Sequence, residues 1–330
     1  MAAQHDSPLL TWSPLTARDL PRWHRLRTVI AETDGADQWP TEAELVDELD
    51  APWRDACRDT TIGVDGSGTA HAFGVVDLRP GDRTLLRARC LGGVDPGWRG
   101  LGIGRRLLAW QLDRAGELVA TRRAELVGRV PARALLELDE RWTSATRLAE
   151  RAGMTPIRWS VTTRRDLGDP VPAVPVPRGL RLAGYAPELD ERVRLAHNEA
   201  FTDHGGFQPW TAQAWAHAET GHRDFRPDCS FVVLDGEQIA GYCLSATYPV
   251  DREPAGPGQG WTSRLGVRRP WRGRGVAKVL LTASMRAFQA CGLEYAWLEV
   301  DADDLTGAVA LYAALGYRTT HRRALWAVDL

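Results

Sequence analysis

The chain has 330 residues, more than one domain usually holds, so two units of about 150 residues are the default expectation. Its 41 basic and 43 acidic residues leave a net charge of −2, which argues against the broad basic surface of a nucleic-acid-binding protein. No stretch approaches about 18 uncharged apolar residues and the start has no long apolar run, so neither a membrane span nor a signal peptide is expected.

The first half of the chain predicts a strand and two helices, then an antiparallel meander, then alternating helices and strands. A capping-box pattern marks the start of the second helix, because Thr41 is followed by Glu44. Asp65-Gly-Ser-Gly68 is typical of a hairpin turn. The expected elements are a strand at 9–12, helices at 17–33 and 41–49, strands at 60–64, 70–78 and 83–94, a helix at 107–119, a strand at 124–130, a helix at 143–152 and a strand at 157–163.

Residues 166–179 predict a linker, because four prolines alternate there with small apolar residues and exclude a helix. The linker separates a first domain at 1–165 from a second domain at 180–330. The second domain repeats the plan of the first. Its expected elements are a strand at 180–184, helices at 189–201 and 211–219, strands at 230–234, 238–248 and 261–267, a helix ending before Gly292, a strand at 295–300, a helix at 306–315 and strands from Tyr317 to the end.

A glycine-rich turn with its flanking residues occurs twice, and it organises each half. The segments at 94–108 and 267–281 align without a gap and share Val, Trp, Arg, Gly, Gly, Leu and Leu at equivalent positions. Each reads as the end of a strand, a turn and the start of a helix. Such a turn exposes backbone N–H groups at a helix N-terminus, which favours an anion such as the phosphate of a cofactor. The repeat therefore predicts two similar domains in tandem.

Three phosphate-binding patterns compete for this turn, and spacing separates them. A Walker loop requires Gly-x-x-x-x-Gly-Lys-Ser/Thr, which the chain lacks. A dinucleotide fingerprint requires Gly-x-Gly-x-x-Gly, whereas Gly273 and Gly275 are followed by Ala277 and Lys278. The pattern that fits is Arg-x-x-Gly-x-Gly/Ala, which begins at Arg272 directly after a short apolar strand.

This pattern resembles the acetyl-CoA signature of the GNAT superfamily of N-acetyltransferases. The resemblance implies an α+β fold of two tandem GNAT-like domains, each a mixed, mostly antiparallel sheet flanked by helices. It also implies that the turn binds the pyrophosphate of acetyl-CoA, or of another acyl-CoA, while the preceding strand pairs with the pantetheine arm. The implied cofactor-binding residues are Leu265, Gly266, Val267, Arg272, Gly273, Arg274, Gly275, Val276, Ala277 and Lys278 in the second half and Gly93, Val94, Arg99, Gly100, Leu101, Gly102, Ile103 and Gly104 in the first.

A second GNAT-like segment runs from residue 301 to 317, and its tyrosine is the candidate catalytic acid. In the family this tyrosine protonates the departing CoA thiolate, a role that Tyr312 takes by position; Asp304 stands where the family often has Asn. A phenol can supply that proton, because the conjugate acid of the thiolate has a pKa near 8.5. The alternative is that Tyr312 is one more aromatic side chain on a core-facing helix. In the first half Ala149 occupies the equivalent position, so that domain is expected to be catalytically degenerate.

The acceptor site is less defined by the sequence. Candidate substrate-contacting residues are Glu199, Asp203, His204, Glu299 and Asp301, each of which has a solvated side chain or a helix cap as its alternative role. In a tandem enzyme of the family with a thiol-sugar acceptor, a glutamate lies early on the strand before the second turn; Trp261 stands there in this chain, which argues against the same acceptor. The general base stays unassigned. No metal site is predicted, because the acidic cluster at 301–304 lacks the glycine and distal glutamate of a calcium loop.

The leading hypothesis is an N-acyltransferase that moves an acetyl group from acetyl-CoA to an amine by direct attack in a ternary complex. The expected partner is a small-molecule amine acceptor, with no nucleic acid and no membrane, and the oligomeric state is open. Two alternatives are a non-catalytic acyl-CoA-binding or regulatory protein and an enzyme active in its first domain. Five cysteines without a Cys-x-x-Cys pair predict reduced thiols in a cytoplasmic protein.

Overall fold

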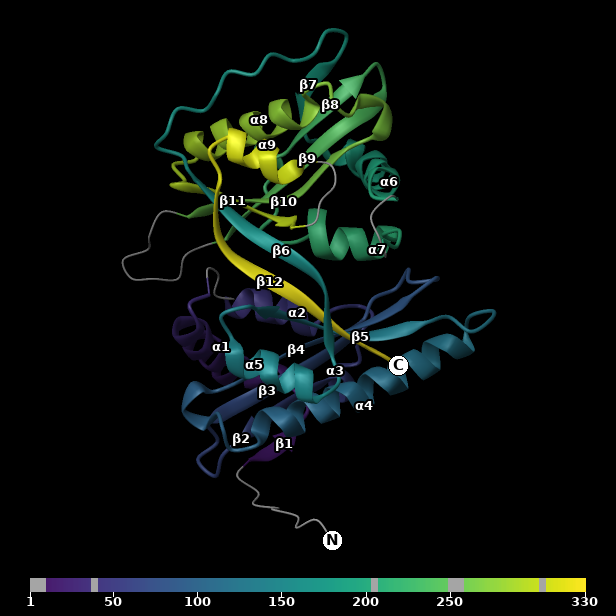
Figure 1. Cartoon of the computed structure of the whole chain (residues 1–330), viewed down its shortest axis with the longest axis vertical. Helices are drawn as coiled ribbons and strands as arrows, with labels where there is room; N and C mark the ends of the chain where they lie inside the picture. Colours follow the sequence, from purple (N-terminus) through teal and green to yellow (C-terminus); the bar gives the residue numbers. More distant parts are fainter. Residues whose placement is uncertain (1–9, 37–40, 203–206, 249–257, 303–306) are drawn as a thin grey trace.

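The computed structural model describes residues 10–36, 41–202, 207–248, 258–302 and 307–330. Figure 1 shows two lobes joined by two long strands. The helices are α1 (Leu20–Asp34), α2 (Glu42–Leu49), α3 (Ala56–Asp59), α4 (Ile103–Ala124), α5 (Thr143–Arg151), α6 (Asp190–Ala200), α7 (Ala212–Trp215), α8 (Val276–Ala290) and α9 (Ala308–Ala314). The strands are β1 (Thr11–Ser13), β2 (Thr60–Val64), β3 (Ala70–Leu78), β4 (Leu86–Val94), β5 (Ala132–Asp139), β6 (Thr155–Asp166), β7 (Arg181–Gly184), β8 (Phe231–Asp235), β9 (Gln238–Tyr248), β10 (Gln259–Val267), β11 (Tyr295–Asp301) and β12 (Arg318–Asp329).

Within the described residues, the strands form one continuous sheet in the order β1-β2-β3-β4-β5-β12-β6-β11-β10-β9-β8-β7. Neighbouring strands are antiparallel except for two parallel pairs, β4 with β5 and β10 with β11. The two halves of the sheet repeat each other, since each parallel pair follows a run of antiparallel strands. This arrangement is the mixed, mostly antiparallel sheet that the sequence predicts for each half.

The strands β6 and β12 join the halves, because each crosses into the other half of the sheet. β6 closes the first half in sequence, yet its Ser160–Asp166 segment pairs with β11 of the second half. β12 closes the second half, yet its Arg323–Asp329 segment pairs with β5 of the first. Between these contacts β6 and β12 pair with each other along most of their length, and Figure 1 shows them side by side. Twelve extended residues span about 40 Å, enough to reach from one lobe into the next.

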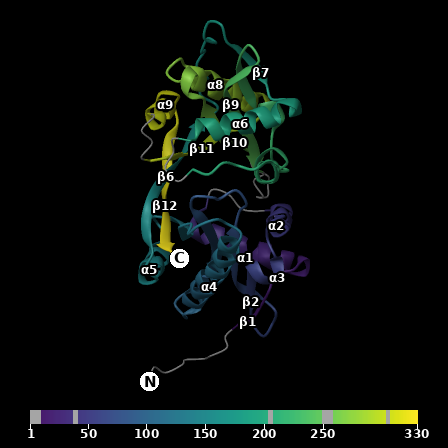
Figure 2. The same cartoon turned by 90° about the vertical axis from the view of Figure 1, so that its right-hand side faces the viewer.

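The helices cover both faces of the sheet. Because successive side chains of a strand point to opposite faces, the strand residues in each core cluster show which face a helix covers. Helices α1, α2, α6 and α7 pack on one face, over cores that include Trp23 and Trp215. Helices α4, α5, α8 and α9 pack on the other, over cores that include Leu108 and Phe288. Figure 2 shows the sheet from its edge, with α5 and α9 on the same side of it.

The predicted linker lies against the second half of the protein. Leu167 is buried in the core beside α8, and Val171 and Val174 pack against the same helix region. Arg286 of α8 donates to the carbonyl of Pro172 at 2.6 Å, and Gln289 donates to that of Leu167 at 2.6 Å. The proline-rich segment is therefore extended and docked by its backbone. The division into domains at 1–165 and 180–330 stays a prediction, because the sheet itself runs through both.

Most predicted elements are confirmed, and the predicted strand at 124–130 is wrong. β2, β3 and β9 have the predicted bounds, and Thr41 and Glu44 form the capping box. In place of the strand at 124–130, α4 continues to Ala124 and the strand lies at Ala132–Asp139. The sequence of β5, Ala-Arg-Ala-Leu-Leu-Glu-Leu-Asp, is rich in helix formers, so its extended conformation depends on pairing between β4 and β12.

No helix in the part of the chain that the structure describes is long and apolar enough to span a membrane.

Candidate functional site

The two glycine-rich turns have the same backbone conformation. Gly100 and Gly102 have φ of +82° and +82°, and the equivalent Gly273 and Gly275 have +73° and +86°. A side chain is strained at such angles, so glycine is required for the chain to turn from the strand into the helix. A short 3-10 turn containing proline precedes each pair, at 96–98 and 269–271. The shared backbone confirms that the sequence repeat is a structural repeat.

The second turn presents a row of backbone donors to solvent. Within the described residues, the N–H groups of residues 273–277 meet no backbone acceptor, and α8 begins at Val276 immediately beyond them. A Cβ atom placed on Gly273 or Gly275 would meet nothing within 4 Å, so the space in front of these donors is open. Free N–H groups at the start of a 15-residue helix attract an anion through hydrogen bonds and through the helix dipole. The turn can therefore hold a phosphate group.

The arginine of each turn fixes the backbone. Arg272 donates from Nε to the carbonyl of Val267 at 3.1 Å and from Nη2 to that of Ala200 at the end of α6 at 2.6 Å. Arg99 donates to the carbonyl of Val94 at 3.2 Å and makes two bonds to Asp34 near the end of α1, at 2.7 and 2.8 Å. Both guanidinium groups thus tie the turn to a strand end and a helix end. Arg274 and Lys278 are exposed beside the turn.

The parallel strands next to each turn separate before they end. β10 pairs with β11 only as far as Thr262 and Leu298, although the strands continue to Val267 and Asp301. A bulge between Thr262 and Arg264 interrupts the pairing of β10 with β9 at the same level. In the first half, β4 and β5 likewise separate beyond Cys90 and Leu136, but β4 keeps a regular register against β3. Both halves have an opening between two strands, and the second half also has a bulge at its mouth.

Backbone donors line one side of the second opening. Arg268 N–H donates to the carbonyl of Ala240 on β9 at 3.0 Å. Because the N–H groups of a strand alternate in direction, those of Leu265 and Val267 point to the other side, toward the gap left by β11. Gly266 packs over the phenol of Tyr242, where a Cβ atom would come within 2.3 Å of its hydroxyl, so no side chain fits there. The predicted residues at 265–267 therefore form one edge of the opening.

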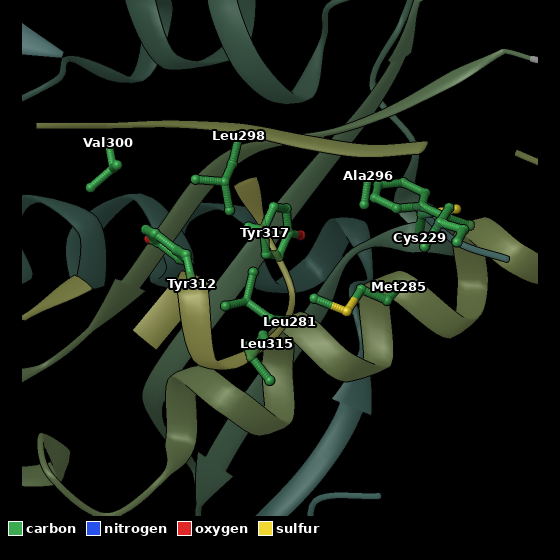
Figure 3. Packing of buried hydrophobic residues seen from close by; sticks show 11 residues of the cluster. Cys229, Leu281, Met285, Ala296, Leu298, Val300, Tyr312, Leu315 and Tyr317 are labelled. Carbon is green, nitrogen blue, oxygen red and sulfur yellow. The ribbon is translucent and has the colours of Figure 1, made fainter. Parts of the chain in front are cut away.

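Tyr312 lies where the strands part. It is 8% exposed, on the short helix α9, and belongs to a core cluster that also contains Leu265 of β10 and Val300 of β11. Its ring meets the edge of Tyr317, with centroids 5.9 Å apart. In Figure 3 Tyr312 lies below Val300, and its hydroxyl points away from that of Tyr317. The residue is part of the core, as its alternative role requires, and it also borders the opening.

The first half has no phenol at the equivalent place. Ala149 is fully buried on α5, packed with Leu108, Leu138 and Met154. The Cβ of alanine has no proton to donate, so this opening cannot use the same acid.

Among the described residues, the predicted acceptor residues pair with different arginines. Glu199 is ion-paired with Arg268 beside the turn, at 2.7 Å. Glu299 is on β11, one residue beyond the last paired position, and lies 3.7 Å from Arg323 of β12. Asp301 lies 4.0 Å from Arg158 of β6. Asp203 and His204, like Asp304, lie outside the described residues. Glu299 and Asp301 thus share a face of β11, as alternation predicts, while Glu199 stands apart.

Glu299 belongs to a charged group that the sequence did not indicate. This junction cluster comprises Arg79, Arg89, Glu137, Glu219, Arg264, Glu299 and Arg323, contributed by both halves. Arg323 lies between Glu137 at 3.6 Å and Glu299 at 3.7 Å. Arg264, at the bulge of β10, pairs with Glu219 at 2.7 Å. The guanidinium groups of Arg79 and Arg264 both face the ring of Trp210, at 5.5 and 5.4 Å.

Burial shifts the pKa values of several side chains in the junction cluster. Partial burial, and then the negative charge of Glu137, raise the pKa of Glu299, while Arg323 opposes the shift. Burial also raises the pKa of Glu219 against the opposing charge of Arg264. Burial and the charge of Arg89 lower the pKa of Arg79 to about 10. A carboxylate with a raised pKa is a better proton acceptor near neutral pH. The carboxylate of Glu299 lies at the mouth of the opening, and its side chain is about a third exposed.

Several known proteins that this chain resembles are acetyltransferases or proteins of the GNAT family. A family profile described as "Acetyltransferase (GNAT) family" matches residues 191–317. A mycothiol acetyltransferase of Thermobispora bispora is 33% identical over 72% of this chain and 72% of its own length, and one of Frankia alni is 30% identical over 95% and 92%. The crystal structure of a GCN5-related N-acetyltransferase from Sphaerobacter thermophilus superposes with a TM-score of 0.75 and 28% identity, covering 97% of this chain and 95% of that one. A tandem GNAT protein from the clavulanic acid biosynthesis pathway shares the fold, with a TM-score of 0.69 and 19% identity over 97% and 98%.

Proposed function

Since this chain belongs to the GNAT family of acetyltransferases and is an N-acetyltransferase that uses acyl-CoA, we propose that it acetylates the primary amine of a small molecule, with catalysis in its second half. The observation that carries the assignment to the second half is the coincidence of three features there. The second half has a turn whose N–H groups meet no backbone acceptor among the described residues, an opening between β10 and β11, and the phenol of Tyr312 packed against Leu265 of β10. The first half has the turn and the opening but alanine in place of the phenol.

In this proposal the turn binds the pyrophosphate of acetyl-CoA through the N–H groups of residues 273–277. The pantetheine arm then lies along β10, where the N–H groups of Leu265 and Val267 face the gap. Arg274 and Lys278, exposed at the start of α8, are placed to contact phosphate oxygens. The equivalent N–H groups of residues 100–104 would bind a second acyl-CoA in the first half.

Transfer requires one proton to leave the amine and one to reach the thiolate. The amine attacks the thioester carbonyl, and the oxyanion that forms is stabilised by N–H groups of β10 that face the gap. The tetrahedral intermediate then expels the CoA thiolate, which takes a proton from the Tyr312 hydroxyl. Glu299 receives the proton of the attacking amine, because its carboxylate stands at the mouth of the opening on the face away from α8 and α9.

The acceptor is proposed to approach over the junction cluster. The relatives named mycothiol acetyltransferase support a small-molecule acceptor. Trp261 stacks on Trp297, with centroids 6.1 Å apart, on the same face as Glu299, so aromatic surface borders the approach where a glutamate was expected for a thiol-sugar acceptor. We therefore propose an acceptor other than that sugar.

A panel of small primary amines tests the proposal. The wild-type chain is mixed with acetyl-CoA and each amine in turn; free CoA is followed with a thiol reagent, and the acetylated product by its mass. Amine-dependent release of CoA with an N-acetyl product supports the proposal. Binding of acetyl-CoA without amine-dependent release, across amines that include amino sugars, polyamines and amino acids, would instead support a binding protein.

A non-catalytic role suits the first half specifically. Ala149 and the regular register of β4 leave that half able to hold acyl-CoA without the acid used in the second half. Calorimetry with acetyl-CoA distinguishes one binding site from two, since the stoichiometry counts both turns.

A further inference from the structure

Two cysteines far apart in the sequence meet at the end of α8 that is remote from the cofactor turn. Cys291 follows the last residue of α8 and is exposed, whereas Cys229 ends a short 3-10 turn before β8 and is fully buried. Their sulfur atoms are 3.8 Å apart. A disulfide has an S–S distance of about 2.05 Å, so the sulfurs must approach by about 1.8 Å. Rotation of the exposed Cys291 side chain about its Cα–Cβ bond is the natural way to bring them together.

Charged groups surround Cys291. Arg226 donates from Nη2 to Cys291 Sγ at 3.3 Å and holds the carboxylate of Asp228 with two bonds, at 2.5 and 2.8 Å. The Asp228 carboxylate also accepts from Cys291 Sγ, at 3.9 Å, so a positive and a negative group both border this sulfur. Burial raises the pKa of Cys229 to about 12, so that thiol stays protonated near neutral pH. Because Cys291 is exposed and Cys229 is fully buried, Cys291 is the first of the pair that a hydroperoxide can reach.

The same groups could in principle bind a metal, and the charges argue against it. Ligand atoms of Asp228, Cys229 and Cys291 all lie within 4.8 Å of one another. A tetrahedral zinc site with bonds of about 2.3 Å would also separate two sulfurs by about 3.8 Å. However, both carboxylate oxygens of Asp228 already bond to Arg226, and that guanidinium occupies the place where a cation would gain most. A fourth ligand is also lacking among the described residues.

We propose that Cys229 and Cys291 form a reversible disulfide when the protein meets a hydroperoxide. The Cys291 thiol gives up its proton, and the thiolate attacks an oxygen of hydrogen peroxide, breaks the O–O bond and becomes a sulfenic acid. The hydroxide that leaves takes up the proton that Cys291 released and becomes water. The Cys229 thiol then attacks the Cys291 sulfur and displaces the hydroxyl group, which leaves as water with the Cys229 proton. Both sulfurs are oxidised, the peroxide is reduced to two waters, and a dithiol reductant reverses the reaction.

The disulfide would close the chain between the start of β8 and the end of α8. Cys229 and Cys291 are 62 positions apart, so the crosslink removes freedom from the unfolded chain over the segment between them. Oxidised protein is therefore expected to unfold a few degrees above reduced protein, and reductant should cancel the rise.

Peptide mapping tests the pairing directly. The full chain is oxidised with hydrogen peroxide, alkylated to block free thiols and digested with trypsin. Because the tryptic peptide that contains Cys229 also contains Cys243, the experiment uses the Cys243→Ser variant. The expected result is a crosslinked peptide joining Cys229 to Cys291, which disappears after treatment with a dithiol and in the Cys291→Ser variant.

Three variants distinguish this pair from other cysteines and from metal binding. Cys57 is the other exposed cysteine, so Cys57→Ser should leave the crosslink unchanged, while Cys291→Ser, at an exposed position, should remove it without unfolding the protein. Arg226→Met should slow formation of the crosslink about threefold to tenfold, because it removes the charge beside the attacking sulfur. A crosslink from Cys291 to another cysteine, the absence of any crosslink after complete loss of the free Cys291 thiol, or tight binding of one zinc ion that depends on both cysteines would each overturn the proposal.

Discussion

Replacing Tyr312 with phenylalanine isolates the hydroxyl that the proposed mechanism uses. The residue is 8% exposed and its ring packs among apolar side chains of α9, β10 and β11, next to the edge of Tyr317. Phenylalanine keeps the ring and these contacts. The substitution should therefore preserve the packing of the ring while removing the proton donor from the opening.

The expected loss of rate follows from the leaving group. General acid catalysis is generally worth about 100-fold to 10,000-fold. The CoA thiol has a pKa near 8.5, about one unit above an assay at pH 7.5, so its thiolate leaves more readily than an alkoxide would. The effect should therefore lie at or below the lower end of this range, and we expect kcat to fall about tenfold to a hundredfold, or about 1.4 to 2.7 kcal/mol. The KM for acetyl-CoA should change little, because the N–H groups of the turn remain.

Tyr317→Phe is the matched control, since it removes the other hydroxyl of the same pair of rings. The Tyr317 hydroxyl is buried without a hydrogen-bonding partner among the described residues, so its removal should leave the protein equally stable or more stable by about 1 kcal/mol. It should leave kcat unchanged. Both variants are compared with wild type by steady-state release of free CoA and by thermal unfolding.

A Tyr312→Phe protein that keeps more than about half of the wild-type kcat, with an amine that the wild type acetylates, would refute proton donation by this hydroxyl. Equal losses in the two variants would also refute it, because they would assign the effect to packing of the two rings.

Three further predictions concern the turn, the proton acceptor and the contact between the halves. Gly273→Ala and Gly100→Ala each place a Cβ in open space at a similar positive φ, so both should lower the free energy of unfolding by about 1–2 kcal/mol. Only Gly273→Ala should raise the KM for acetyl-CoA in turnover, about tenfold. Equal effects of the two variants on KM would contradict catalysis in the second half. Because the pKa of Glu299 is raised, the rate should increase with pH through that raised value. Glu299→Gln should lower kcat about tenfold or more and abolish this pH dependence, whereas Glu137→Gln should move it to lower pH, because the charge of Glu137 contributes to the raised pKa. The measurement is the pH–rate profile of the wild type and both variants. Burial, and then the charge of Glu44, raise the pKa of Asp224 to about 6, so between pH 4 and pH 6 the folded state holds a proton that the unfolded state has lost, and stability falls as pH rises. Asp224→Asn should therefore raise the free energy of unfolding by about 1 kcal/mol at pH 8 and leave it unchanged at pH 3, as measured by thermal unfolding. An equal gain at both pH values would contradict the assignment.

Local sequence signals sufficed where a short stretch carries its own structural reason. The hairpin at Asp65 and the capping box at Thr41 were both predicted, because each depends on residues within four positions of one another. The cofactor turn was predicted for the same reason, since two glycines at positive φ, a strand before them and a helix after them are contiguous.

Local signals failed where distant partners determine the conformation. β5 is composed of helix formers and becomes a strand because β4 and β12 pair with it on either side. Glu219 and Arg264 carry no motif, and only the fold brings them within 2.7 Å. The acceptor residues show the same limit, since alternation placed Glu299 and Asp301 on one face of a strand but gave no information about the arginines opposite them.

The sequence by itself determined that two GNAT-like units follow one another, that each has a turn suited to a phosphate, and that only the second has a tyrosine where the first has Ala149. Each of these features depends on a short contiguous segment. Its backbone angles and hydrogen bonds follow from the positions of glycine and proline and from the spacing of the other side chains. The tertiary structure alone decided that β6 and β12 cross between the units, that a charged cluster forms where the units meet, and that Cys229 lies beside Cys291. Each of these depends on pairing between residues far apart in the chain, and burial in the folded sheet is what brings them together.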